Sequence, residues 1–198
     1  HCRPDDHMLD LGCGLGLHCA IATSRHWVAF AVGIDKNAPI SRETQNCHYT
    51  KADLEQPLAW IADDVYHIVL ALDIIEHLHN RTHFLLECHR VLVTGGRLLI
   101  TAPNGASYWR KRLGGQRQDA DHKVEYACAD AFTAILEGVG FTVKSVEPIT
   151  LDTPLAGWID LTAVFSLALY ERLARWRVTQ ASRRPEDSTG WRIVACAR

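Results

Sequence analysis

The 198-residue sequence has no marked excess of either charge, with 21 Lys and Arg against 23 Asp and Glu and a formal net charge of -2. Binding to a nucleic acid or an anionic membrane would therefore need a local patch of basic residues, because the net charge of the chain does not attract an anionic partner. The sequence also lacks a run of about 18 uncharged apolar residues, and it has no basic segment followed by an apolar stretch and a cleavage site. From these absences we expect a soluble, cytoplasmic protein and do not expect nucleic acid as a partner.

Paired cysteines are missing too. The seven cysteines are odd in number and scattered, without a CxxC pair or the spacing of a zinc ribbon, so we expect free thiols in a reducing compartment. Internal repeats and low-complexity tracts are absent, and 47% of the residues are hydrophobic, which predicts one domain with a single core. The chain opens on His1 rather than Met, which leaves open whether an N-terminal segment precedes it.

Apolar strand-like and helical stretches alternate along most of the chain. A short apolar run at 7–11 ends at Gly12, followed by helical composition over 15–25 and a second strand over 28–34. Further strands are expected at 48–52, 66–72, 97–102, 141–146 and 191–197, and further helices at 81–92, 128–139 and 155–176. This order predicts a single α/β domain over 1–198, with a mostly parallel sheet covered by helices on both faces and a helical insertion at about 152–185.

The expected helix at 155–176 is unusually apolar, with only Asp160 and Glu171 as acids, and arginines follow its apolar residues. Such a segment is typical of a lid, or of a helix that packs on the sheet or on a second subunit. It also fits a helix over 155–177 that lies on a membrane surface or covers a lipid-like substrate. The oligomeric state stays open.

A glycine-rich turn joins the first strand to the first helix, with Asp10, Gly12, Gly14 and Gly16 in the run DLGCGLG. Glycines at such a turn permit positive φ and let a ligand lie against bare backbone. The third glycine follows the second by two positions instead of three, so the spacing is wrong for a nicotinamide dinucleotide. An acid two residues before the first glycine would repel a pyrophosphate, whereas it can pair with the ammonium of an amino acid.

A second acid, Asp35, ends the second strand in the run AVGID. At this place in a strand–helix–strand unit, a carboxylate accepts hydrogen bonds from the hydroxyls of a ribose. An ammonium at one end of the ligand and a ribose at the other describe S-adenosylmethionine (SAM).

The runs DLGCGLG, GID, KADLEQPL, VLALDIIEHL and HRVLVTGGRLLITAPN resemble class I SAM-dependent methyltransferases, in the group that includes ubiquinone-pathway and related small-molecule enzymes. The resemblance covers roughly residues 7 to 150. It implies a Rossmann-like fold whose seven-stranded sheet has an antiparallel last strand, with SAM across the carboxyl ends of the first strands. Carried over position by position, it places Asp10, Gly12, Gly14 and Gly16, with Cys13 among them, at the methionine part of SAM, Asp35 followed by Lys36 at the ribose, Asp53 and Leu54 at the adenine edge, and Leu72 beside the cofactor.

The methyl acceptor is expected just past the fourth strand, where Asp73, Glu76 and His77 share one face if the stretch is helical. With His122, they resemble the acid, acid, His set that binds a divalent cation in ubiquinone-pathway O-methyltransferases and in small-RNA 2′-hydroxyl methyltransferases. Two simpler interpretations stay open. Glu76 and His77 would merely cap and pack a helix start, or a metal-free site would use His77, His79 or His122 as the base. His77 and His122 are thus the catalytic candidates.

Other polar residues near the expected site carry weaker signals. The loop YWRKRLGGQR, at 108–117, concentrates basic residues that would attract a phosphate or carboxylate of the acceptor, or that are simply solvated. His18, His26 and His83 lie in helical surroundings without an evident acidic partner, so we interpret them as surface or core residues.

Methyl transfer from SAM to an O or N atom of a small molecule, of glycan or lipid-like character, is the leading hypothesis. One alternative is a metal-dependent RNA 2′-O-methyltransferase, against which the near-neutral charge stands. Another is a noncatalytic SAM-binding partner subunit, against which the intact acids Asp10 and Asp35 stand.

Overall fold

The computed structural model describes residues 2–105, 107, 128–153 and 155–198 of the chain. His122 and the basic loop at 108–117 lie outside the described residues.

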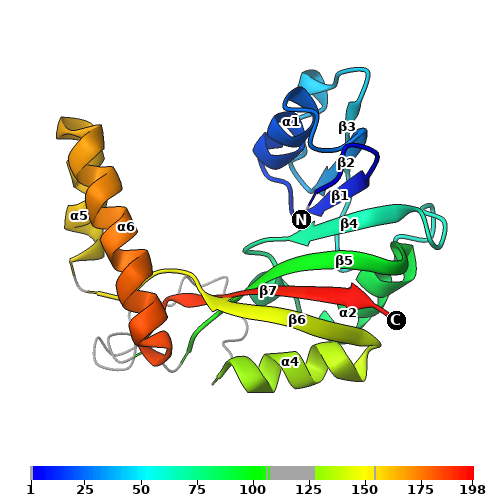
Figure 1. Ribbon diagram of the computed structural model, residues 1–198. Coiled ribbons are helices and arrows are strands. Elements are labelled where there is room, and N and C mark those ends of the chain that lie inside the picture. The colour runs from blue at the N-terminus through cyan, green and yellow to red at the C-terminus, as the bar shows by residue number, and fades with distance from the viewer. Residues whose placement is uncertain (1, 106, 108–127, 154) are drawn as a thin grey trace.

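One seven-stranded sheet organises the protein, in the strand order β3-β2-β1-β4-β5-β7-β6 (Figure 1). β1 to β5 pair in parallel with their neighbours, and β7 runs antiparallel to both β5 and β6. The predicted fold, with its antiparallel last strand, is therefore confirmed. The strands are β1 His7–Leu11, β2 Phe30–Asp35, β3 Cys47–Lys51, β4 Tyr66–Ala71, β5 Leu92–Pro103, β6 Phe141–Pro148 and β7 Gly190–Ala197.

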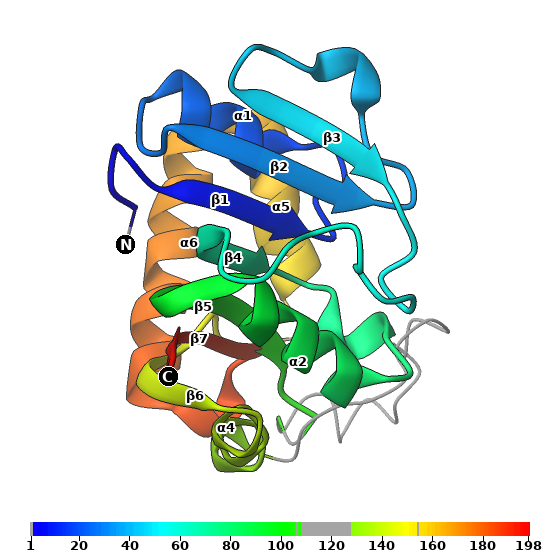
Figure 2. The same cartoon turned by 90° about the vertical axis from the view of Figure 1, so that its right-hand side faces the viewer.

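Helices pack on both faces of the sheet because residues along a strand point alternately to either side. Met8 of β1 packs with Cys19 of α1, whereas Leu9 belongs to a larger cluster with Phe84 of α2 and Phe132 of α4. Figure 2 shows α2 in front of the strands and α1 behind them. The helices are α1 Leu17–Ser24, α2 Arg81–Val91, α4 Ala129–Gly138, α5 Ala156–Phe165 and α6 Leu167–Arg183, with short 3-10 turns η1 Ile40–Arg42, η2 Ile75–His77 and η3 Pro185–Asp187.

The prediction of a single helix at 155–176 is wrong. The helix is interrupted at Ser166, and the two parts, α5 and α6, form a helical hairpin. Ser166 has extended backbone dihedrals, and its hydroxyl accepts a hydrogen bond from the Leu169 backbone N–H at 3.3 Å. A serine that caps a new helix is the local signal for this break. In Figure 1 the hairpin stands away from the sheet, beyond the edge at which β4 and β5 end. None of the described helices has the length and apolar character needed to cross a membrane.

The strand order sets where a ligand can bind. β2 and β4 lie on opposite sides of β1, so the order in which strands are added to the sheet reverses at β1. The crevice at the carboxyl ends of the strands beside such a reversal is the usual ligand site of an open α/β sheet. The pairing register places Asp10 of β1 between Gly33 of β2 and Leu70 of β4. The residues that follow these three strands therefore meet at one edge.

At the opposite edge, Arg97 of β5 donates to the buried carboxylate of Asp6, which also accepts from the Arg3 backbone N–H at 2.8 Å. We expect Arg97→Ala to lower the free energy of unfolding by about 3–5 kcal/mol, because it leaves a buried carboxylate without its cation. Urea denaturation of Arg97→Ala, Asp6→Ala and the double variant measures this. The double variant should cost much less than the two single losses together, and additive losses would contradict a coupled pair.

Candidate active site

The turn after β1 folds back onto the end of β2. The backbone N–H groups of Gly12 and Cys13 both donate to the Ile34 carbonyl, at 2.8 and 3.1 Å. Gly16 adopts φ +72°, and a Cβ there would lie 2.4 Å from the ring of Tyr49, whose hydroxyl donates to the Gly16 carbonyl at 2.9 Å. Gly14 is also in the left-handed region, but a Cβ there would meet nothing within 4 Å. Tyr49 thus supports the turn at Gly16, whereas the space beside Gly14 is unoccupied by atoms of the described residues.

Asp35 joins the glycine turn directly. Its carboxylate accepts from the Gly14 backbone N–H at 3.1 Å and from the Asn37 backbone N–H at 2.7 Å. The acid expected at a ribose and the turn expected at the methionine part therefore lie one hydrogen bond apart. Lys36, which follows Asp35, points its ammonium to Asp53 at 3.3 Å.

Asp10 is buried at the end of β1, with 1% of its surface exposed. Within the described residues, its carboxylate has only long contacts, to His18 Nδ1 at 3.5 Å and to Cys19 Sγ at 3.9 Å. A buried carboxylate ordinarily has closer donors, so Asp10 retains the capacity to bind a cationic ligand group.

The interpretation of His18 as a residue without an acidic partner is wrong, because its Nδ1 lies 3.5 Å from the Asp10 carboxylate. Its hydrogen bond to Asp10 is the main cause that raises the pKa of its imidazole above 6.5, and the negative charge of Asp73 adds to this, against the effect of partial burial. The two residues stand on either side of the glycine turn, so their pairing depends on how that turn folds. His18 is half exposed and belongs to the candidate site.

Cys13 contributes its backbone and not its thiol to this edge. The thiol packs beneath the turn, since a Cβ on Gly33 would lie 2.8 Å from its Sγ. Burial, with the charges of Asp10 and Asp35, raises the pKa of the Cys13 thiol to about 12, so the thiol stays protonated.

The loop after β3 carries the residues expected at the adenine. Asp53 is half-buried and accepts from the Glu55 backbone N–H at 3.0 Å, and Leu54 is buried. The loop is held by Glu55, whose role the sequence did not indicate. Its carboxylate accepts from the His79 backbone N–H at 2.8 Å and the Asn80 backbone N–H at 3.3 Å, and it contacts His79 Nδ1 at 2.9 Å. These contacts, the His79 backbone N–H first, lower the pKa of Glu55 to about 2 and join the loops after β3 and β4.

The segment after β4, where we expect the methyl acceptor and which we call the acceptor edge, is not helical at Asp73. Asp73 precedes the single 3-10 turn η2 and has φ +51°, so it does not share a helical face with Glu76 and His77. Its carboxylate and backbone N–H both bond to the Thr101 hydroxyl, at 3.0 and 2.7 Å. Asp73 is exposed, His77 is half-buried and Glu76 is buried.

No three His, Cys, Asp or Glu side chains gather as a metal site in the part of the chain that the structure describes. A metal bound with His122 stays a prediction, as do the catalytic roles of His77 and His122, because His122 lies outside that part. Leu72 is half-buried and packs with the cluster beneath α1.

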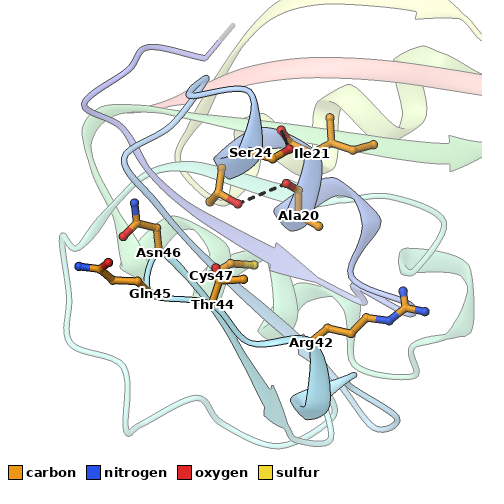
Figure 3. A pocket seen from close by; sticks show the side chains of 9 residues that line it. Ala20, Ile21, Ser24, Arg42, Thr44, Gln45, Asn46 and Cys47 are labelled. Atoms are coloured by element: carbon orange, nitrogen blue, oxygen red, sulfur yellow. Dashed lines mark hydrogen bonds between the residues drawn. The ribbon is translucent and has the colours of Figure 1, made fainter.

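A separate hollow lies away from these residues, between α1 and the start of β3 (Figure 3). It has a volume of about 480 Å³ and is lined by Ala20, Ile21, Thr23, Ser24, Arg42, Thr44, Gln45, Asn46 and Cys47. None of the residues expected to hold the cofactor lines it.

Known proteins resemble this chain over most of its length. Residues 2–146 match the family described as "Methyltransferase domain". The chain is 26% identical over 164 residues to 27-O-demethylrifamycin SV methyltransferase of Amycolatopsis mediterranei, covering 75% of this chain and 58% of that protein. It is 27% identical over 192 residues to the mitochondrial ubiquinone biosynthesis O-methyltransferase of Rattus norvegicus, covering 87% and 54%. The chain thus spans little more than half the length of these relatives.

Solved structures share the fold. A crystal structure of a SAM-dependent methyltransferase from Archaeoglobus fulgidus superposes with a TM-score of 0.65 at 20% identity, covering 97% of this chain and 86% of that one. At this level of identity, the similarity establishes the architecture alone.

The two glycines Gly14 and Gly16 provide a matched test of the turn. Both have positive φ, so Ala at either position should cost about 1–2 kcal/mol of backbone strain. Gly16→Ala adds a clash with the Tyr49 ring and should lower the free energy of unfolding by at least twice as much as Gly14→Ala. Equal losses in urea denaturation would contradict the bracing role of Tyr49.

The Asp10–His18 pair predicts a pH dependence of stability. The folded state binds the imidazole proton more tightly than the unfolded chain, so the pair stabilises the protein fully below pH 6.5 and loses this effect as pH rises through the raised pKa. The difference in free energy of unfolding between the parent and His18→Gln should therefore shrink as the pH rises from 6.5 through the raised pKa of His18. His26→Gln, an exposed histidine after α1, is the control, and a difference that stays constant with pH would exclude the pairing.

Proposed function

The chain belongs to the methyltransferase domain family, and from this membership we propose that it binds SAM at the glycine turn and transfers the methyl group to an O or N atom of a small-molecule acceptor. The observation that carries the proposal is the bond from the Gly14 N–H to Asp35 at the carboxyl edge of β1 and β2. It brings the acid that we expect at the ribose beside a turn that can hold an amino acid, at the edge where the strand order reverses.

The described residues fit SAM in charge and in space. Asp10 is buried with distant donors, which suits the cofactor's ammonium, and the open space at Gly14 suits a ligand laid against backbone. Asp35 is the acceptor for the ribose hydroxyls, and Asp53 is the acid near the adenine. One Asp53 oxygen already contacts Lys36 and the Glu55 N–H, so its second oxygen is the one left for a ligand.

When bound, SAM supplies a sulfonium whose methyl group an acceptor atom can attack in line while the sulfur takes the bonding electrons. The protein's part is alignment, together with removal of the acceptor's proton where the acceptor is a hydroxyl. Asp73 and His77 lie at the acceptor edge, and Thr101 holds Asp73 in its left-handed conformation. His77, half-buried in η2, is our candidate for the base.

The acceptor is proposed at the level of class. The two relatives are named for methyl transfer to 27-O-demethylrifamycin SV and for O-methylation in ubiquinone biosynthesis, and both names concern small molecules. They favour an oxygen atom of a small molecule over RNA.

Calorimetric titration with S-adenosylhomocysteine, the product form of the cofactor, tests the site without knowledge of the acceptor. We expect Asp35→Ala to weaken binding at least tenfold, since it removes charge-assisted hydrogen bonds to the ribose. Asp130→Ala, an exposed acid at the start of α4, is the matched control and should bind like the parent.

Thermal melting of each variant separates a lost ribose contact from a loosened turn, because Asp35 also accepts from Gly14 and Asn37. Binding to Asp35→Ala as tight as to the parent would overturn the cofactor assignment. Repetition with magnesium, manganese and zinc tests the metal hypothesis separately, since a metal effect that His122→Ala abolishes would support a divalent site.

A further inference from the structure

The helical hairpin of α5 and α6 exposes large apolar side chains at its tip, which we define as Val164, Phe165 and Leu167. Their exposed fractions are 75%, 80% and 64%. Folded proteins seldom leave contiguous apolar surface of this kind in water unless it contacts a partner or a membrane.

The apolar surface continues along α5. Trp158, Leu161 and Phe165 recur at helical spacing and so lie on one side of the helix, with Trp158 71% and Leu161 46% exposed. The one large apolar residue of α5 turned inward is Ile159, which is 8% exposed. The exposed side of α5 is therefore distinct from the side that packs.

The base of the hairpin, in contrast, is held in place. Arg177 has only 11% of its side chain exposed, donates to the Leu151 carbonyl at 3.3 Å and lies 3.6 Å from Asp160 of α5. Ala181 is fully buried. An anchored base and an exposed tip make the hairpin an arm that presents its tip away from the sheet (Figure 1).

Charge distinguishes among possible partners of this surface. The segment 155–184 carries two acids, Asp160 and Glu171, and its cations are five arginines at Arg172, Arg175, Arg177, Arg183 and Arg184. Arg175 and Arg177 lie 3.9 and 3.6 Å from Glu171 and Asp160, so the hairpin keeps a net positive charge in a chain whose formal net charge is -2. A second copy would bring the same arginines to the interface, whereas an anionic surface complements them.

The order of residues along α6 also matches a membrane interface. Arg172 follows the tip residue Leu167 by five residues, which places it about 8 Å further along the helix axis. Apolar faces of interfacial helices enter the headgroup region by about 5–10 Å, so an inserted tip would bring Arg172 to the level of the lipid phosphates. Trp176, 47% exposed, lies one turn beyond Arg172, and tryptophan is enriched at that level.

We propose that the hairpin tip docks the protein on an anionic lipid bilayer, with Val164, Phe165 and Leu167 inserted among the headgroups and with Arg172 and Arg175 of α6 against lipid phosphates. The contact is peripheral. The hairpin lies on the side of the sheet at which β4 and β5 end (Figure 1).

Flotation with vesicles tests this without SAM or an acceptor, so its outcome is independent of the proposed function. The chain should float with vesicles of phosphatidylcholine and phosphatidylglycerol, and added salt should weaken the binding. Phe165→Ser should reduce binding at least tenfold, whereas Trp27→Ser, which removes an aromatic 53% exposed near the amino end of β2, should leave it unchanged. Replacement of both Arg172 and Arg175 by Glu should reduce binding at least tenfold, and Arg25→Glu is the control for charge.

Circular dichroism and thermal melting confirm that each variant is folded. Absence of binding to anionic vesicles, or equal binding by Phe165→Ser and the parent, would overturn the proposal. Light scattering measures the oligomeric state and so tests whether the tip contacts a second copy of the chain. A dimer that Phe165→Ser dissociates, together with no vesicle binding, would assign the tip to a second copy of the chain and reject the membrane.

Discussion

The hydrogen bond from the Gly14 N–H to the Asp35 carboxylate is the contact on which the candidate site depends. It forms because β1 and β2 pair in parallel and end side by side, which brings the turn after one strand to the acid that ends the other. Tyr49 of β3 supports the same turn through the Gly16 carbonyl. Three neighbouring strands thus position a glycine-rich turn in which Cys13 supplies the one buried side chain.

Carboxylates play the same structural part around the rest of this edge. Glu55 joins the loops after β3 and β4, and Asp73 ties the end of β4 to Thr101 of β5. Glu55 accepts from backbone N–H groups and Asp73 accepts from a hydroxyl, and hydrogen bonds to a charged acceptor are the stronger kind. The edge therefore consists of loops whose relative positions depend on carboxylates, and the buried Asp10 has only long contacts, to His18 and Cys19, among the described residues.

The helical hairpin differs from the sheet in that it exposes large apolar side chains instead of burying them. Strand pairing and the two core clusters place the loops of the site with little freedom, whereas α5 and α6 contact mainly each other and carry apolar residues outward. An arm anchored at Arg177 and exposed at Phe165 adds an interaction surface without disturbing the strand order. The candidate site and the exposed hairpin tip therefore lie on different elements of the domain.

The sequence by itself determined the fold class, most of the strands and the glycine turn with Asp10 and Asp35, because these signals are local: apolar periodicity, glycine spacing and an acid at a strand end. Only the tertiary structure decided that His18 pairs with Asp10, that Glu55 holds His79 and that Asp73 leaves the expected helical face. Those contacts join residues that come together through the folding of turns and loops. The break at Ser166 lies between the two cases. Its serine cap is a local signal, but the continuous apolar composition on both sides hides it, and the exposure of Phe165 follows from packing that no local pattern records.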